Sequence, residues 1–181
     1  MVGPLVIPGR YTVKITVPGL SAPITGTAVV DADPLPKFNA VDRAARQALL
    51  MRIYEWTKTL GTARTAARAL VAQRDSIKAD LHGDAQADSL NVRIARTAAD
   101  IDRAMLAVNA TRGPIEGWSG MPSVDQRQVL NNATDDAGKA LAALNKLVNT
   151  DIPSAYQSIA KKPWPRKVSG VAAPLGASRA R

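Results

Sequence analysis

The chain of 181 residues contains no cysteine, a single histidine and only 4% aromatic residues. Because cysteine is absent, disulfide bonds, thiolate zinc sites and a cysteine nucleophile are excluded. No stretch approaches the roughly 18 consecutive apolar residues of a membrane-spanning helix, and residues 1–10 lack the basic-then-apolar order of a signal peptide. The sequence therefore predicts no transmembrane segment, and it leaves the localisation unknown.

The net charge of +9 is the feature that favours an acidic partner such as nucleic acid or an anionic membrane surface. The basic residues are spread along the chain, and two groups account for much of the excess. One lies in the last stretch and the other is expected on the outer surface of the first helix: Lys161, Lys162, Arg166, Lys167, Arg179 and Arg181, then Arg43, Arg46, Arg52, Lys58, Arg64, Arg68 and Lys78. We interpret them as a solvated basic surface, with nucleic-acid binding as the alternative.

Residues 39–82 carry the clearest periodicity and predict one long helix with a heptad seam. The apolar residues follow at four- and three-residue steps, and only Arg74 is out of character. The seam consists of Leu49, Ile53, Trp56, Leu60, Ala63, Ala67, Leu70, Ile77 and Leu81. Asn39 is the expected N-cap, Asp42 suits the first turn, Gly61 is expected not to interrupt the helix, and Gly83 is the expected left-handed C-cap.

Two further segments continue the pattern and predict an antiparallel three-helix bundle. Their apolar positions are Leu90, Ile94, Ala98, Ile101, Met105 and Val108, then Leu130, Ala133, Ala137, Leu141, Leu144 and Val148. Asp84 or Asp88 is expected to cap the second helix, which ends at Gly113. The box formed by residues 123–126 is expected to open the third helix, which runs to about Thr150.

Two shorter segments complete this helical part. Ile115, Trp118 and Met121 are expected to fold back over one end of the bundle. Residues 151–160 are expected to form a short last helical turn, with Pro153 near its first position.

The N-terminal residues 1–33 predict a β-hairpin. Tyr11, Val13 and Ile15 alternate with polar residues, and residues 24–30 form a second strand. A two-stranded hairpin is marginal in water and leaves two edges unpaired. Three arrangements are open: the hairpin lies against the bundle, pairs with another chain, or ends a larger sheet whose other strands are not in this chain.

The predicted organisation is thus mainly α with a small β part. Residues 1–33 form the hairpin, 34–38 a stiff linker, 39–162 the bundle with its short terminal helix, and 163–181 a basic tail. The tail is expected to be disordered after Trp164 or to lie extended on the surface. Trp164 itself is expected to dock the tail onto the helices, in preference to stacking on a base or meeting a membrane interface.

No constellation of residues predicts catalysis, a metal or a cofactor. His82 has Asp80 and Asp84 nearby in sequence, but groups at a helix end more often cap that end than bind metal. The carboxylate pairs Asp135–Asp136 and Asp100–Asp102 would diverge on a helix, so we expect them to pair with arginines on the surface.

Several segments together resemble the C-terminal region of bacterial sortilin-like proteins built from BNR (Asp-box) repeats. The similarity covers the chain up to Val168. It is carried by Pro8-Gly9-Arg10-Tyr11-Thr12-Val13-Lys14-Ile15-Thr16-Val17, Asp33-Pro34, the long Ala/Arg-rich helix, Leu144-Asn145-Lys146-Leu147 and Asp151-Ile152-Pro153. In that family a β-propeller is followed by an Ig-like domain, whose last strands carry the first of these patterns, and then by a helical bundle.

The resemblance implies that the hairpin is the end of an Ig-like sandwich, and that this chain is a non-catalytic accessory module at the C-terminus of a larger, commonly exported protein. Such proteins are often labelled glycosyl hydrolases or sialidase-like, but that activity would belong to the propeller. The chain holds no Asp-box (SxDxGxTW), so no catalytic residue is carried over. The implied partners are the propeller and Ig-like portions, and the oligomeric state is left open.

Overall fold

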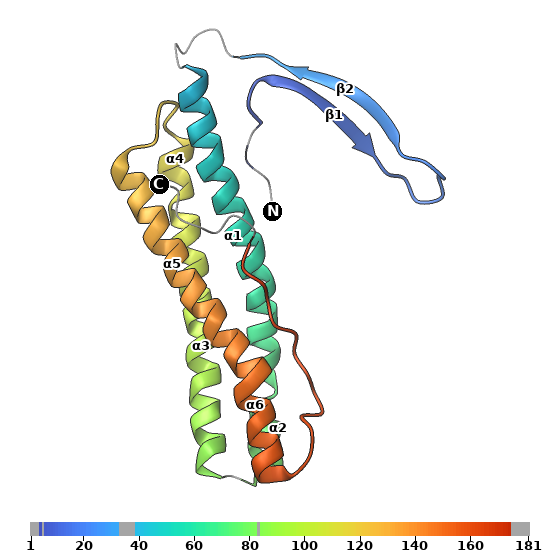
Figure 1. Cartoon of the computed structure of the whole chain (residues 1–181), viewed down its shortest axis with the longest axis vertical. Helices are drawn as coiled ribbons and strands as arrows, with labels where there is room; N and C mark the ends of the chain where they lie inside the picture. Colours follow the sequence, from blue (N-terminus) through green and yellow to red (C-terminus); the bar gives the residue numbers. More distant parts are fainter. Residues whose placement is uncertain (1–3, 5, 33–38, 83, 175–181) are drawn as a thin grey trace.

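The computed structural model describes residues 4, 6–32, 39–82 and 84–174. Three long helices, α1 (Ala40–Ala72), α3 (Ala85–Ala110) and α5 (Val124–Lys146), lie side by side, and an N-terminal hairpin extends away from them (Figure 1). The prediction of a mainly helical protein with a small β part is confirmed. None of the helices in these ranges combines the length and apolar character needed to cross a membrane. The expected linker at 34–38 lies outside the described residues.

The first helix begins where the sequence predicts. The side chain of Asn39 accepts a hydrogen bond from the amide of Asp42 at 2.8 Å, and the helix continues through Gly61. It ends at Ala72, however, and α2 (Arg74–Asp80) follows after Gln73. The single helix predicted for residues 39–82 is therefore wrong. The break lies beside Arg74, the one seam position held by a charged residue.

After α2, His82 takes the left-handed backbone conformation, with φ of 54°. The expected C-cap, Gly83, lies outside the described residues.

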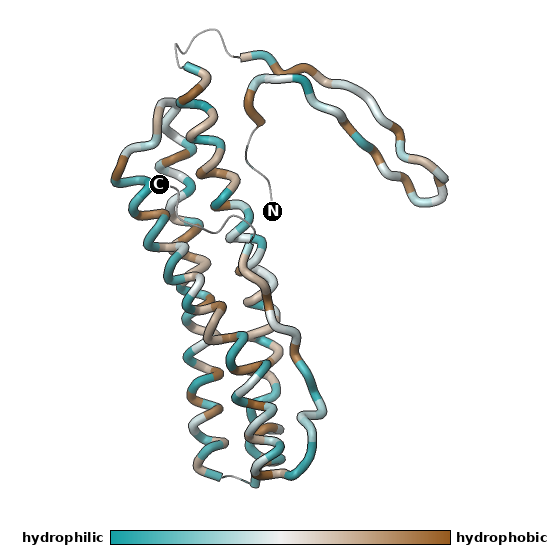
Figure 2. The backbone as a smooth tube through the Cα atoms, viewed as in Figure 1, coloured by the Kyte–Doolittle hydropathy of each residue, from teal (hydrophilic) through white to brown (hydrophobic). Residues whose placement is uncertain are grey.

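The predicted seams form the core. Every seam residue from Leu49 to Leu81 is at most 5% exposed, and so are most of their counterparts in α3 and α5. Ala98 and Met105 are only partly buried but contact this core. Figure 2 shows hydrophobic and hydrophilic residues alternating along each helix, as burial of one side requires. Burying each large side chain contributes roughly 1.5–3 kcal/mol to stability.

The connection from α3 to α5 contains a short helix that the sequence did not predict, α4 (Arg112–Glu116). Ile115 is buried as expected, but Trp118 is 55% exposed and Met121 42% exposed, so the expectation that both fold over the bundle end is wrong. Arg46 of α1 gives the physical reason, since its guanidinium donates hydrogen bonds to the carbonyl oxygens of Ile115 and Glu116. These bonds fix α4 against α1 and leave the following segment outside.

The capping box that opens α5 is confirmed. Ser123 Oγ accepts from the amide of Gln126 at 3.1 Å, and Gln126 Oε1 accepts from the amide of Ser123 at 2.9 Å. We predict that Ser123→Ala lowers the free energy of unfolding by about 0.5–2 kcal/mol. Urea denaturation measures this loss. Ser119→Ala, in the same connection but outside the box, is the control and should change stability by less than about 0.5 kcal/mol. Equal losses in both variants would contradict a capping role.

Helical structure extends to Ala160, as predicted, but without a gap after the third long helix. The α-helix α5 ends at Lys146, and a π-helical turn, η1 (Leu147–Asp151), then α6 (Ile152–Ala155) and η2 (Tyr156–Ala160) follow directly. Pro153 lacks the amide hydrogen that an α-helix would direct to Asn149, and the wider turn of η1 precedes it. Ile152 and Ala155 are buried, so packing carries the helix past the proline.

The tail is ordered over its described part. Residues 163–174 run extended along the helices, where Trp164 is 4% exposed and Val171 8% exposed. This docking corrects the expectation of disorder for these residues and agrees with the extended alternative. The physical reason is that the two side chains join the core cluster. Residues 175–181 lie outside the described residues.

The predicted hairpin is confirmed. Strand β1 (Gly9–Ile15) pairs antiparallel with β2 (Ile24–Val30), in a register that runs from Gly9 opposite Val30 to Ile15 opposite Ile24. Together they make a sheet of two strands.

Candidate functional site

The described part of the chain holds no group of three or more His, Cys, Asp or Glu residues that could hold a metal ion. His82 is exposed, and its two acidic neighbours in sequence are engaged elsewhere. Asp84 caps α3 by accepting from the amide of Gln86 at 2.7 Å, and Asp80 accepts from Tyr156 at 2.7 Å. The structure therefore does not bring these three residues together as a site.

The two carboxylate pairs are likewise separated. Asp100 pairs with Arg103 at 2.6 Å and Asp136 with Lys139 at 2.7 Å, each within its own helix. Asp102 pairs across helices with Arg64 at 2.6 Å. Because each of these carboxylates has a cation as its partner, none is placed to share a proton with another carboxylate in acid–base catalysis.

One polar cluster was not expected from the sequence. Tyr156 donates its hydroxyl hydrogen to Asp80 at 2.7 Å, and Lys162 Nζ donates to the other oxygen of the same carboxylate at 3.1 Å. The bond from Tyr156, followed by that from Lys162, holds the pKa of Asp80 below its ordinary value. Burial and the Asp80 bond raise the pKa of Tyr156. Tyr156 is thus a neutral hydrogen-bond donor that joins η2 to α2, and it is unsuited to act as a base.

The Asp80 cluster predicts an acid-sensitive contribution to stability. Because the folded-state pKa is depressed, the contribution is present above the unfolded value, near 3.8, and is lost as the pH falls through the lower folded value. We expect Asp80→Asn to remove this dependence, so that its urea midpoint changes less than that of the unaltered protein between pH 5 and 2. Asp75→Asn, on the same helix, is the control and should retain the dependence. Identical acid profiles for all three proteins would contradict the assignment.

Four basic residues expected on the outer surface of the first helix contact neighbouring elements instead. Arg52 donates to Asn131 Oδ1 at 2.6 Å and to the hydroxyl of Thr134, and its burial lowers its pKa. Arg64 pairs with Asp102 of α3 at 2.6 Å, and Lys78 pairs with Asp88 of α3 at 2.8 Å. Together with Arg46, which bonds to α4, these side chains connect helices. Arg64 and Lys78 stay 41% and 52% exposed, so this basic surface is solvated in part and paired in part, which leaves fewer cations for phosphates.

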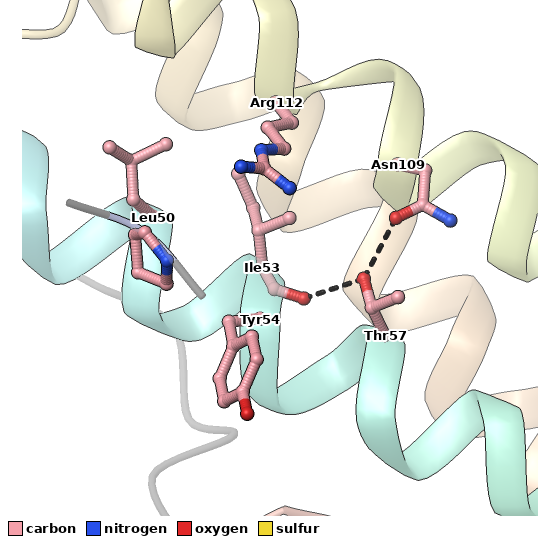
Figure 3. A pocket seen from close by; sticks show the side chains of 7 residues that line it. Leu50, Ile53, Tyr54, Thr57, Asn109 and Arg112 are labelled. Carbon is pink, nitrogen blue, oxygen red and sulfur yellow. Dashed lines mark hydrogen bonds between the residues drawn. The ribbon is translucent and has the colours of Figure 1, made fainter. Parts of the chain in front are cut away.

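A small cavity lies between α1 and the end of α3. Its volume is about 70 Å³ and its lining is Pro4, Leu50, Ile53, Tyr54, Thr57, Asn109 and Arg112 (Figure 3). Thr57 Oγ1 lies 2.8 Å from the carbonyl oxygen of Ile53 and 2.9 Å from Asn109 Oδ1. Arg112 is paired with Glu116 at 2.9 Å. Ligand sites usually exceed about 300 Å³, so this cavity suits a few water molecules and no substrate.

The hairpin presents the most informative surface. Residues directly opposite each other in an antiparallel pair project from the same side of the sheet. One side is therefore apolar, with the pairs Tyr11–Ala28, Val13–Gly26 and Ile15–Ile24, and the other carries Arg10, Thr12, Lys14, Thr25 and Thr27, together with Val29. We call the first side the apolar hairpin face. Most of this face is uncovered, since Val13 is 44% exposed, Ile15 52% and Ile24 56%, whereas Tyr11 and Ala28 are half-buried.

Both outer edges of the hairpin are also available, because in the described residues β1 and β2 pair only with each other. The alternation in the sequence already indicated an apolar side of β1. Which β2 residues join it follows only from the register, which the turn determines. An amphipathic hairpin with a bare apolar face is typical of a sheet that packs on another layer.

Comparisons of the chain with models of protein families, with curated proteins and with solved structures find no match. The resemblance to sortilin-like proteins thus stays a prediction from the residues. What the structure adds is the geometry of the hairpin.

Proposed function

We propose that this protein is a non-catalytic C-terminal accessory module of a larger sortilin-like, BNR-repeat propeller protein. In this proposal the hairpin supplies the last strands of an Ig-like β-sandwich, and α1, α3 and α5 form an antiparallel three-helix bundle with a structural or interaction role. The observation that carries the proposal is the uncovered apolar hairpin face.

The energetic argument rests on what that face leaves exposed. An isolated two-stranded hairpin is marginally stable in water. Full burial of an exposed side chain contributes roughly 1.5–3 kcal/mol, so covering the half-exposed Val13, Ile15 and Ile24 would contribute about half of that for each. The opposite side carries Arg10 and Lys14, which suit solvent. One apolar side, one polar side and free edges for neighbouring strands are what an outer pair of strands in an antiparallel sandwich requires.

The helices support a non-enzymatic role for this part of the parent protein. Their polar clusters join one element to another, as with Asp80 and Tyr156 or Arg64 and Asp102. Any glycosyl hydrolase activity of the parent would lie in its propeller, and a hydrolase is the third candidate function. It is tested by coding sequence with Asp-boxes upstream of the codon for Met1.

The first experiment determines the N-terminus of the natural protein by mass spectrometry and reads the coding sequence upstream. We expect an in-frame extension that encodes β-strands and Asp-box repeats. A natural chain that begins at Met1 would overturn the proposal.

A pair of hairpin variants then tests the sandwich within the natural protein. Ile24 lies on the apolar hairpin face and Val29 on the opposite side, and they are similarly exposed at 56% and 61%. We expect Ile24→Asp to speed amide exchange of the β-strands several-fold, because it places a charge in the sandwich core, while Val29→Asp leaves exchange unchanged. Equal effects of the two variants would contradict a covered apolar face.

A freestanding basic protein that binds nucleic acid or another acidic partner is the alternative, and its support is the net charge of +9. Titration with duplex and single-stranded DNA at increasing salt separates the two. A phosphate-binding surface loses affinity steeply as salt rises, whereas the accessory module shows no affinity to lose.

A further inference from the structure

Four exposed apolar side chains belong to elements that meet at one end of the helices. They are Val41, Trp118, Met121 and Val124, which are 67%, 55%, 42% and 70% exposed, and we call this group the end patch. The start of α1 and the connection from α4 to α5 lie at the same end, at the top of Figure 1. The hydrogen bonds from Arg46 to Ile115 and Glu116 hold these two parts together.

The exposure of Trp118 is the main reason to assign a role to this surface. The other two tryptophans, Trp56 and Trp164, are only 2% and 4% exposed. An uncovered tryptophan at the same end of a fold as other exposed apolar side chains is typical of an interaction site, because aromatic anchors supply much of the binding energy in interfaces.

The length of the linker indicates what covers the end patch. Residues 33–38 join Ala32, just after β2, to Asn39 at the start of α1. A fully extended chain gains at most about 3.3–3.6 Å per residue, so Ala32 stays within about 25 Å of Asn39, and the end of β2 at Val30 within about 36 Å of the start of α1 at Ala40. Any sheet that the hairpin completes is therefore tethered beside the end patch at a high effective concentration.

We propose that the end patch is the docking surface for the β-sandwich that the hairpin completes, with Trp118 as the anchor. This inference rests on the function proposed above. The sandwich docks through the end from which the chain leaves β2, and docking fixes the orientation of the sandwich relative to the helices.

Fluorescence quenching tests the proposal directly. Because Trp56 and Trp164 are buried, acrylamide quenching of this 181-residue chain reports mainly on Trp118. In the natural longer protein, the difference in emission between the unaltered protein and its Trp118→Phe variant isolates the same residue. We expect the quenching constant of Trp118 to be several-fold lower in the longer protein. An unchanged constant overturns the docking proposal.

A pair of surface variants adds a second readout. Val124→Glu alters the end patch, and Val92→Glu alters an equally exposed valine near the start of α3, where the exposed fractions are 70% and 66%. Glutamate is favourable in a helix and at its first turn, so both variants are expected to fold. In the longer protein, Val124→Glu should speed proteolysis at residues 33–38 several-fold and Val92→Glu should not. Equal rates overturn docking.

Amide exchange of the hairpin separates this inference from the proposed function. A protected hairpin together with a freely quenched Trp118 overturns docking alone. A hairpin that exchanges freely in the longer protein, or a natural chain that begins at Met1, overturns both proposals.

Discussion

Replacing Trp164 by alanine is expected to lower the free energy of unfolding by about 3–5 kcal/mol and to release the tail from the helices. The side chain is 4% exposed and joins the core cluster, together with Val171 and the partly buried Val168. Its indole nitrogen has no hydrogen-bond partner among the described residues, so the loss is one of packing. Urea denaturation measures the loss of stability, and amide exchange of residues 164–171 measures the release.

Trp118→Ala is the matched control for this prediction. It removes the same side chain from a position that is 55% exposed in this chain, so the stability should change by less than about 0.5 kcal/mol. A loss of similar size in both variants, or tail amides that exchange no faster in Trp164→Ala, would contradict the docking of the tail.

The tail is held by its backbone as well as by its side chains. Asn145 of α5 accepts from the amide of Val171 at 2.8 Å and donates to the carbonyl oxygen of the same residue at 2.8 Å. The side-chain amide of Asn145 thus pairs with both backbone polar groups of Val171, as the backbone of a neighbouring strand would. Gly170 is needed beside them, because a Cβ there would lie 2.8 Å from Asn145 Oδ1.

The sequence predicted the docking of Trp164, but it did not decide whether the residues that follow are disordered or extended on the surface. The composition of residues 163–181 favours disorder, since prolines, glycines, serines, alanines and basic residues predominate. Order arises from partners more than twenty positions away in sequence, chiefly Asn145. Tertiary packing also explains why the helix continues through Pro153, because the burial of Ile152 and Ala155 outweighs the local effect of the proline.

The parts that were predictable depend on local pattern. The apolar heptad positions from Leu49 to Leu81 are all buried, and the caps at Asn39 and Ser123 lie where their residue types predict them. The break at Gln73 was not predictable in this way, because one charged residue at a seam position does not by itself indicate that a helix ends.

The candidate site was likewise predictable only where it depends on local pattern. The alternation along β1 predicted an apolar side of the hairpin. The exposure of that side, and that of Trp118, depend on tertiary packing, which a local pattern does not reveal. The contacts of the basic residues of the first helix were not predicted. Their placement away from the seam suggested solvent, but Arg52 and Arg64 are long enough to reach partners on neighbouring helices.

Leu60→Ala is expected to lower the free energy of unfolding by about 2–5 kcal/mol. Leu60 is fully buried on α1, at the middle of the predicted seam, and the neighbouring seam positions on either side are also buried. The substitution leaves a cavity that the surrounding helices fill only in part. Since small domains are stable by about 5–15 kcal/mol, thermal and urea unfolding should both show a large shift.

Leu106→Ala gives the comparison that makes the first result informative. The same chemical change is made on α3, where the side chain is 71% exposed, so the expected loss stays below about 0.5 kcal/mol. The difference between the two variants then measures burial, because the removed atoms are identical. Similar losses at both positions would mean that the heptad seam is not what stabilises these helices, and the assignment of the core would have to be abandoned.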